Sequence, residues 1–302
     1  MNWIDDFQNE FPGTHLRDEP MSLHTSFRIG GPADLMYIPN SVNALDAALR
    51  YLNLEGIPVL ILGGGYNLLV SDKGFRGAAV KLPEDIVAPI DFQGETVTAS
   101  AGLPLKRLVR EAASRGLAGI ENLAGIPGTV GGAIYMNAGA YGSCVADVFQ
   151  SAQAVCPEGG MRTMSAGDLR FSYRSSILQE MRCTVITGAE FKMRPGANPA
   201  ELEERCREII RVRNGKHPVG LPSAGSFFKN TRGLPPAGRL IEEAGLKGLA
   251  VGGAQVSPMH ANFIVNTGGA TCREVLDLMA RVQEQVQRVH GVLLEPEVRI
   301  IP

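Results

Sequence analysis

The sequence lacks the patterns that indicate a metal centre or a disulfide scaffold. The five cysteines are Cys144, Cys156, Cys183, Cys206 and Cys272. Their number is odd, and no two of them lie at the spacing of a zinc or redox motif. The five histidines are also too scattered to suggest a ligand set. We therefore expect free, reduced thiols and no metal.

The sequence also lacks an excess of charge of one sign and an uninterrupted apolar run. The formal net charge is −2, which gives no field that would attract nucleic acid or an anionic membrane. The N-terminal residues MNWIDDFQNEFPG are acidic and contain no apolar core of a signal peptide. Residues 122–146 are uncharged, but Pro127 and several glycines argue against a membrane helix. These absences predict a cytoplasmic protein that binds neither nucleic acid nor membrane.

The two common nucleotide-binding fingerprints are missing as well. No G-x-x-x-x-G-K-[ST] sequence occurs, so a P-loop is excluded. The predicted strand 59–62 runs into Gly63-Gly64-Gly65, but Leu68 stands where a G-x-G-x-x-G motif needs its third glycine. What remains is a tight turn whose backbone N–H groups can hold a pyrophosphate.

A second glycine cluster, NLAGIPGTVGGAIYMNAGAYG at residues 122–142, is the most informative stretch of the chain. Each glycine in a regular element costs about 0.5–1 kcal/mol relative to alanine, so this composition predicts no helix. It is typical of backbone that approaches a large, flat ligand closely. Two glycine clusters, each after a strand, predict a dinucleotide cofactor held from two sides.

The hydrophobic pattern predicts alternating helices and strands. Expected strands are 35–39, 59–62, 78–82, 96–100, 148–156, 183–193, 250–256, 262–266 and 292–301. Expected helices follow Ser41, Pro104 and residue 200, cover 237–244, and follow a capping box formed by Thr271 and Glu274. Residues 214–236 are predicted to be a loop. Because side chains alternate along a strand, Glu295 and Glu297 are expected on one face of the last strand.

Five motifs in order resemble the UDP-N-acetylenolpyruvoylglucosamine reductase (MurB) family. They are the two glycine clusters, Tyr173-Arg174-x-Ser176, GSFFKN (225–230) and LEPEVR (294–299), and the likeness extends from HTSFRIGGPAD (24–34) to the last residue. The last third has no obvious extra loop, and in this respect the chain resembles the type II subclass of the family.

The resemblance implies an α+β protein with an FAD-binding fold of the PCMH or vanillyl-alcohol-oxidase type. It implies an N-terminal segment 1–24, an FAD-binding domain 25–193 with subdomains of about 25–85 and 86–193, and a C-terminal α+β substrate-binding domain 194–302. We expect a monomer.

The resemblance also implies a reaction, in which NADPH reduces bound FAD and the flavin then reduces UDP-N-acetylglucosamine enolpyruvate to UDP-N-acetylmuramate for peptidoglycan synthesis. Hydride addition at C3 of the enolpyruvyl group leaves negative charge at C2, so cations and a proton donor are needed there. The resemblance assigns Arg174 to the carboxylate, Ser226 to the proton and Glu297 to the catalytic acid, with Glu295 as the alternative glutamate. Another flavin oxidase and a non-catalytic flavin-binding module are the competing hypotheses.

The remaining site residues follow from the same resemblance. Tyr173, Lys229 and Asn230 are expected to bind substrate. The expected FAD-binding residues are Gly63, Gly64, Gly65, Tyr66, Asn67, Leu68, Gly125, Gly128, Thr129, Gly131, Gly132, Ala133, Asn137, Gly139 and Gly188. The chain departs from the family pattern at Tyr66, where serine is usual, and at Thr231, where proline is common. Tyr66 therefore removes an expected side-chain contact to the FAD phosphates and leaves the backbone contacts.

Overall fold

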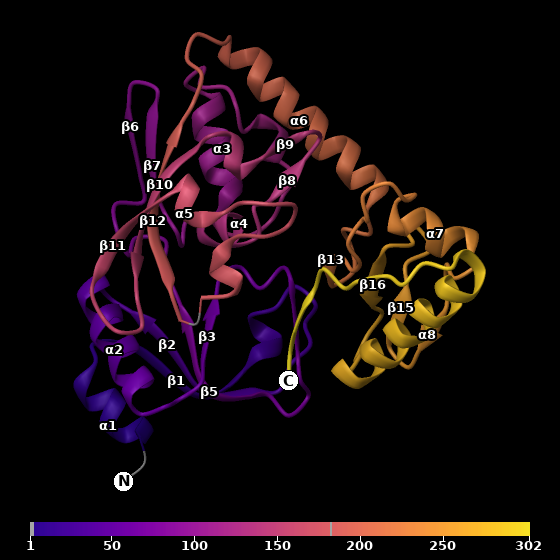
Figure 1. Cartoon of the computed structure of the whole chain (residues 1–302), viewed down its shortest axis with the longest axis horizontal. Coiled ribbons are helices and arrows are strands. Elements are labelled where there is room, and N and C mark those ends of the chain that lie inside the picture. Colours follow the sequence, from indigo (N-terminus) through magenta and orange to yellow (C-terminus); the bar gives the residue numbers. More distant parts are fainter. Residues whose placement is uncertain (1–2, 182) are drawn as a thin grey trace. The chain divides into compact units, whose positions relative to one another are not determined.

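The computed structural model (Figure 1) describes residues 3–181 and 183–302. The chain divides into two units, each made up of three separate stretches. Unit 1 contains the chain up to Asp18 together with residues 34–64 and 76–211. Unit 2 contains residues 19–33, 65–75 and 212–302. The predicted division into 1–24, 25–193 and 194–302 is a different partition of the chain and stays a prediction.

The first layer of unit 1 is a four-stranded sheet in the order β1-β2-β5-β3. Its elements are α1 (Trp3–Glu10), β1 (Gly13–Pro20), β2 (Pro32–Pro39), α2 (Val42–Leu54), β3 (Val59–Leu62) and β5 (Phe75–Lys81). The predicted cap of α2 is confirmed, because Ser41 Oγ accepts a hydrogen bond of 3.2 Å from Ala44 N. Helix α2 buries Leu45, Leu49 and Leu52 against a core that also contains Phe7 of α1. Neither α1 nor β1 was predicted from the sequence.

The second sheet of unit 1 has five antiparallel strands in the order β11-β10-β12-β7-β6 (Figure 1). Helix α4 packs on β12 and β7 and, with α3, covers the larger apolar core of the unit. The strands and helices are β6 (Ile90–Gln93), β7 (Thr96–Ser100), α3 (Leu105–Ala113), α4 (Val130–Tyr135), β8 (Gly139–Ala140), β9 (Ser143–Cys144), β10 (Phe149–Val155), β11 (Met161–Ser165), α5 (Ala166–Leu169), β12 (Val185–Lys192) and α6 (Pro199–Lys216). Short 3₁₀ turns are η2 (Glu121–Leu123), η3 (Val145–Asp147) and η4 (Ile177–Gln179).

The prediction that residues 122–142 contain no helix is wrong, because α4 lies inside this cluster. Thr129 caps the helix, its Oγ1 accepting a hydrogen bond of 3.2 Å from Gly132 N. Val130, Ala133 and Ile134 are buried. Burial of these apolar side chains outweighs the conformational cost of Gly131 and Gly132 in a helix of six residues.

Unit 2 is built on a four-stranded antiparallel sheet in the order β13-β16-β15-β14. Helix α8 packs on β14, β15 and α7 (Figure 1). The elements are η1 (Met21–Leu23), β4 (Leu68–Val70), β13 (Ser223–Ser226), α7 (Ala237–Glu243), β14 (Ala250–Val251), β15 (Ala254–Val256), β16 (Phe263–Asn266), α8 (Cys272–His290) and β17 (Arg299–Ile301). The capping box at Thr271 and Glu274 is confirmed. The N-terminal segments contribute Phe27, Ile29 and Leu69 to the same core.

Two predictions for the last third are wrong in part. Residues 214–236 are not all loop, since α6 continues to Lys216 and β13 occupies Ser223–Ser226. The last strand covers Arg299–Ile301 only, where it pairs in parallel with β4. Pro296 has no N–H group to donate, and the preceding segment forms only an isolated bridge between Pro296 and Phe228. Glu295 and Glu297 therefore do not lie on a regular strand.

Within residues 3–181 and 183–302, no helix is long and apolar enough to cross a membrane. The same part of the chain contains no group of three or more His, Cys, Asp or Glu side chains that could hold a metal ion. All five cysteines are free thiols, as predicted.

Candidate active site

Gly63, the first residue of the first glycine cluster, lies beside the second cluster within unit 1. Gly63 follows β3, and a Cβ atom added to it would lie 2.9 Å from Thr129 Oγ1 and 3.8 Å from Gly132 Cα. A side chain at residue 63 would therefore collide with the cap of α4.

The N–H groups of the second cluster are largely used by the protein itself. Val130 N donates to Leu103 O at 2.8 Å, and Gly131 N donates to Ala101 O at 2.8 Å. Gly132 N is bound by the cap. The N–H groups at the beginning of α4 are therefore hydrogen-bonded within the protein and are not available to a ligand. The glycines of the cluster allow close approach to the backbone. In the described part of the chain, by contrast, the N–H groups of Gly64, Gly65 and Tyr66 make no hydrogen bond within the protein.

The other predicted FAD residues have mixed surroundings. Ala133 is buried in the core, and Gly128 O accepts a hydrogen bond of 2.9 Å from Leu105 N. Gly188 lies in β12, opposite Ser100 of β7. Gly125 is half-buried, and Leu68 lies in β4 of unit 2.

Asn137 makes protein contacts with both ends of its side-chain amide. Its Nδ2 donates to Ser172 O at 2.9 Å, and its Oδ1 accepts from Ala146 N at 3.1 Å. The residue is buried and has a positive φ of 41°. It therefore ties the second glycine cluster to the loop that carries Arg174.

Arg174 lies at the tip of a tight turn in unit 1. Ser172 and Ser175 exchange backbone hydrogen bonds of 3.0 and 3.2 Å across the turn, and Arg174 has a φ of 55°. Its Nη1 donates to Gly139 O at 2.8 Å. Next to the turn, the buried Ser176 donates from its hydroxyl to Tyr135 O at 2.8 Å. Arg174 is half-buried, and the Tyr173 ring beside it is exposed.

The predicted residues of unit 2 converge on residues 226–230. Phe227 O accepts a hydrogen bond of 2.8 Å from Glu297 N, and Lys229 N donates to Glu295 O at 2.8 Å. Ser226 is the last residue of β13 and follows Gly225, which has a φ of 82°. Ser226 and Glu297 are thus joined through Phe227, by one peptide bond and one hydrogen bond.

The two glutamates of the LEPEVR motif have different partners. Lys229 Nζ donates to Glu295 Oε1 in an ion pair. The side-chain amide of Asn67 donates to Glu297 O at 3.0 Å, and Asn67 O accepts from Arg299 N at 2.9 Å. Asn230 has a structural contact, its Oδ1 accepting a hydrogen bond of 2.9 Å from Ala237 N at the start of α7.

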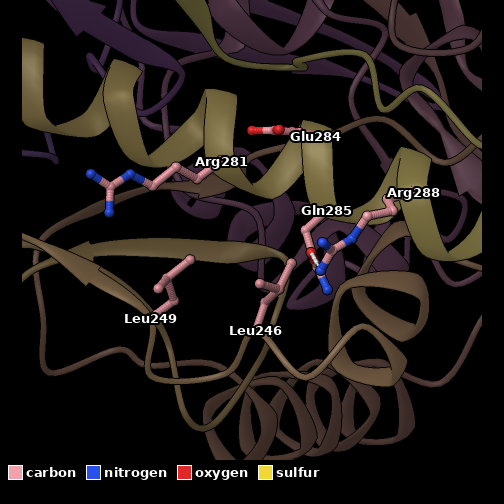
Figure 2. A pocket seen from close by; sticks show the side chains of 6 residues that line it. All are labelled: Leu246, Leu249, Arg281, Glu284, Gln285 and Arg288. Carbon is pink, nitrogen blue, oxygen red and sulfur yellow. Dashed lines mark hydrogen bonds between the residues drawn. The ribbon is translucent and has the colours of Figure 1, made fainter.

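One surface pocket of unit 2 contains none of the predicted residues. It has a volume of about 350 Å³ and lies between α8 and the chain after α7 (Figure 2). Its lining is formed by Leu246, Leu249, Arg281, Glu284, Gln285 and Arg288. Four of these side chains come from α8, and Arg288 donates to Gln285 Oε1.

Two sequence models of known protein families match this chain, one mainly in its first half and one in its last third. Residues 33–165 match a sequence model described as an FAD binding domain. Residues 217–301 match the model described as UDP-N-acetylenolpyruvoylglucosamine reductase, C-terminal domain.

The chain is 45% identical over 294 residues to a UDP-N-acetylenolpyruvoylglucosamine reductase from Rubrobacter xylanophilus, covering 97% of each chain. It is 44% identical over 286 residues to the enzyme of that name from Alkaliphilus oremlandii, covering 95% of this chain and 93% of the relative. The crystal structure of UDP-N-acetylenolpyruvylglucosamine reductase (MurB) from Thermus caldophilus matches with a TM-score of 0.80 and 34% identity, covering 96% of this chain and 99% of that one.

Proposed function

This chain belongs to the UDP-N-acetylenolpyruvoylglucosamine reductase family of FAD-dependent enzymes in peptidoglycan precursor synthesis, and we propose that its catalytic residues are Arg174, Ser226 and Glu297. The substrate is UDP-N-acetylglucosamine enolpyruvate and the product is UDP-N-acetylmuramate. The reaction reduces one carbon–carbon double bond, so the protein must bind the substrate's carboxylate and supply one proton.

The glycine clusters fit FAD. The N–H groups of Gly64, Gly65 and Tyr66, which make no hydrogen bond within the described part of the chain, are donors suited to a pyrophosphate. Gly132 leaves room for a ligand, because a Cβ there would meet only Thr129 Oγ1, at 3.4 Å. When bound, FAD supplies the hydride that it receives from NADPH.

Arg174 is proposed to bind the carboxylate of the enolpyruvyl group. A planar guanidinium can donate two parallel hydrogen bonds to a carboxylate. The Gly139 carbonyl orients the guanidinium through Nη1. As hydride addition at C3 transfers negative charge to C2 and the carboxylate, a fixed cation stabilises that charge more than it stabilises the ground state.

Ser226 is proposed to donate its hydroxyl proton to C2, and Glu297 is proposed as the acid that returns a proton to the Ser226 oxygen, so that one proton in total reaches the product. A serine hydroxyl alone is a weak acid, so nearby charged or proton-donating groups must assist it. Their shared contact with Phe227 limits how far the Ser226 and Glu297 backbones can move apart. Tyr173, Lys229 and Asn230 are proposed to bind the sugar nucleotide, with Lys229 also restrained by Glu295.

The observation that carries this function is the combination of an FAD binding domain with the C-terminal domain of this reductase family in one chain. The test is an absorption spectrum of the purified protein. We expect a yellow protein that NADPH bleaches under anaerobic conditions and that the enolpyruvyl sugar nucleotide then reoxidises. Bleaching without reoxidation by this substrate would overturn the proposal in favour of another flavin enzyme, and no bleaching would favour a binding module.

The place of the reaction in the cell follows from its product. We propose that the protein acts in the cytoplasm, where UDP-linked precursors are made, and as a monomer. Loss of the enzyme is then expected to affect cell shape, cell division and the cell cycle, because these depend on peptidoglycan.

A further inference from the structure

Asn262, which is absent from every sequence motif considered above, makes three hydrogen bonds to the segment after Ser226. Its backbone carbonyl accepts from Phe227 N at 2.7 Å. Its side-chain Oδ1 accepts from Phe228 N at 2.9 Å, and its Nδ2 donates to Phe228 O at 2.8 Å. Asn262 and both phenylalanines are buried.

These bonds replace a regular strand pairing. The β13–β16 register is broken between Ser223 and Ser226, and Ser226 is the last residue of β13, opposite Phe263. Beyond that point the amide of Asn262 binds the backbone of Phe228 in the way that a neighbouring strand would. Buried backbone groups that lose such a partner are costly, so the segment is held in one position.

The same segment is bound from its other side by the glutamate motif. Glu297 N donates to Phe227 O at 2.8 Å, and Asn67 Nδ2 donates to Glu297 O at 3.0 Å. A continuous series of hydrogen bonds thus runs from Asn67 through Glu297 and Phe227 to Asn262. Ser226 is attached to it by the peptide bond to Phe227.

We propose that Asn262 is a positioning residue for proton transfer, which fixes the Ser226 backbone relative to that of Glu297. This inference rests on the proposed function. A displacement of about 1 Å in a catalytic group can reduce a rate about 100-fold. Asn262 acts through Phe227 and Phe228, so its effect should be confined to the step that uses Ser226.

Asn266 provides a matched control. It is the last residue of β16, four positions after Asn262, is also buried, and makes three side-chain hydrogen bonds: to Phe27 O at 3.1 Å, from Gly268 N at 2.9 Å and from Ala270 N at 3.1 Å. None of them reaches the segment 226–230. Asn262→Ala removes two buried side-chain hydrogen bonds, both to Phe228, and Asn266→Ala removes three. Only the bonds of Asn262 reach the segment that carries Ser226.

The experiment measures the two half-reactions of the FAD-loaded protein by stopped flow. For Asn262→Ala we expect flavin reoxidation by saturating enolpyruvyl substrate to slow at least tenfold, while reduction by NADPH changes less than about threefold. Asn266→Ala should lower the melting temperature and keep both rates within about threefold of wild type. Equal slowing of both half-reactions in Asn262→Ala, or the same reoxidation defect in Asn266→Ala, would overturn the inference.

A second variant applies if Asn262→Ala does not fold. Asn262→Asp keeps the shape, but only its protonated form can donate to Phe228 O. Reoxidation, relative to wild type at the same pH, should then fall as pH rises through the pKa of the new carboxyl group, and Asn266→Asp should show no such fall. An unchanged ratio across pH would contradict the inference. Failure of wild-type protein to be reoxidised would instead contradict the proposed function, so the two failures are distinguishable.

Discussion

Arg174 combines a backbone conformation that suits glycine with a side chain that the reaction needs. Its φ of 55° lies in the left-handed region, which costs a non-glycine residue about 1 kcal/mol or more. The family motif Tyr173-Arg174-x-Ser176 allowed its role at the substrate carboxylate to be proposed from the sequence. The sequence did not reveal its contact with Gly139, because the two residues are 35 positions apart.

We expect Arg174→Gly to be more stable than Arg174→Ala by about 1 kcal/mol, because both lose the same side-chain contacts but only alanine is strained at positive φ. Both variants should reduce flavin reoxidation at least 100-fold. Chemical denaturation and stopped-flow kinetics check the two expectations separately. Equal stability of the variants would show that the turn relaxes when the arginine is removed.

Ser226→Ala should leave bleaching by NADPH nearly unchanged and suppress reoxidation by the enolpyruvyl substrate. Ser226→Cys should retain part of the second step, since a thiol is a competent acid. Ser223→Ala, at the other end of β13, is the control and should affect neither step. Loss of both half-reactions in Ser226→Ala would remove the serine from the proton-transfer role.

At the scale of elements, α4 shows where local reasoning failed. Glycine content argued against a helix, but the six residues between Thr129 and Met136 are held by a cap and by an apolar face in the unit 1 core. Elements with strong periodicity and clear caps, such as α2 and α8, were predicted well. The last strand was not, because the pairing of residues 295–297 with 227–229 depends on contacts distant in sequence.

Gly132→Ala should stabilise the FAD-free fold by up to about 1 kcal/mol, because alanine is the better helix former. An added Cβ there would contact only Thr129 Oγ1, at 3.4 Å. The same methyl group should raise the dissociation constant of FAD at least tenfold by blocking close approach. Thermal unfolding of the FAD-free protein and flavin titration measure the two effects. Unchanged FAD affinity would place the flavin elsewhere.

Thr129→Ala should cost about 1 kcal/mol of stability, the usual value of a helix cap. Thr271→Ala removes the equivalent cap of α8, whose Oγ1 accepts from Glu274 N at 3.2 Å, and should cost a similar amount. Only Thr129→Ala should also weaken FAD binding. A comparable loss of affinity in both variants would mean that general destabilisation, and not the cap of α4, controls the flavin site.

At the scale of the whole molecule, unit 2 depends on parts of the chain that precede most of unit 1 in sequence. Phe27, Ile29 and Leu69 lie in the unit 2 core, and β4 is paired with β17. Family motifs predicted the residues of the candidate site across the whole chain. Neither motifs nor periodicity predicted this interleaving, because a short apolar segment does not indicate which core it will join.

Stability should depend on pH through His217. Burial, followed by the nearby positive charge of Arg213, lowers the pKa of His217 to about 4, and burial also lowers that of His260. A histidine in the unfolded chain has a pKa of about 6.5. Below pH 6.5 the unfolded chain therefore binds protons that the folded chain does not bind, which favours unfolding. The melting temperature should therefore fall from pH 7 toward pH 4. In His217→Gln the fall should be smaller, and an identical slope would exclude His217 as its cause.

The interleaved construction of unit 2 also limits how this protein can exchange parts with its relatives. A single crossover that replaces residues 212–302 would set a foreign β17 and α8 against the original β4, Phe27 and Leu69. A chimera that also takes residues 19–33 and 65–75 from the same donor keeps every contact within unit 2 native. The three segments of unit 2 are thus expected to be inherited together, since recombination at one junction breaks their common core.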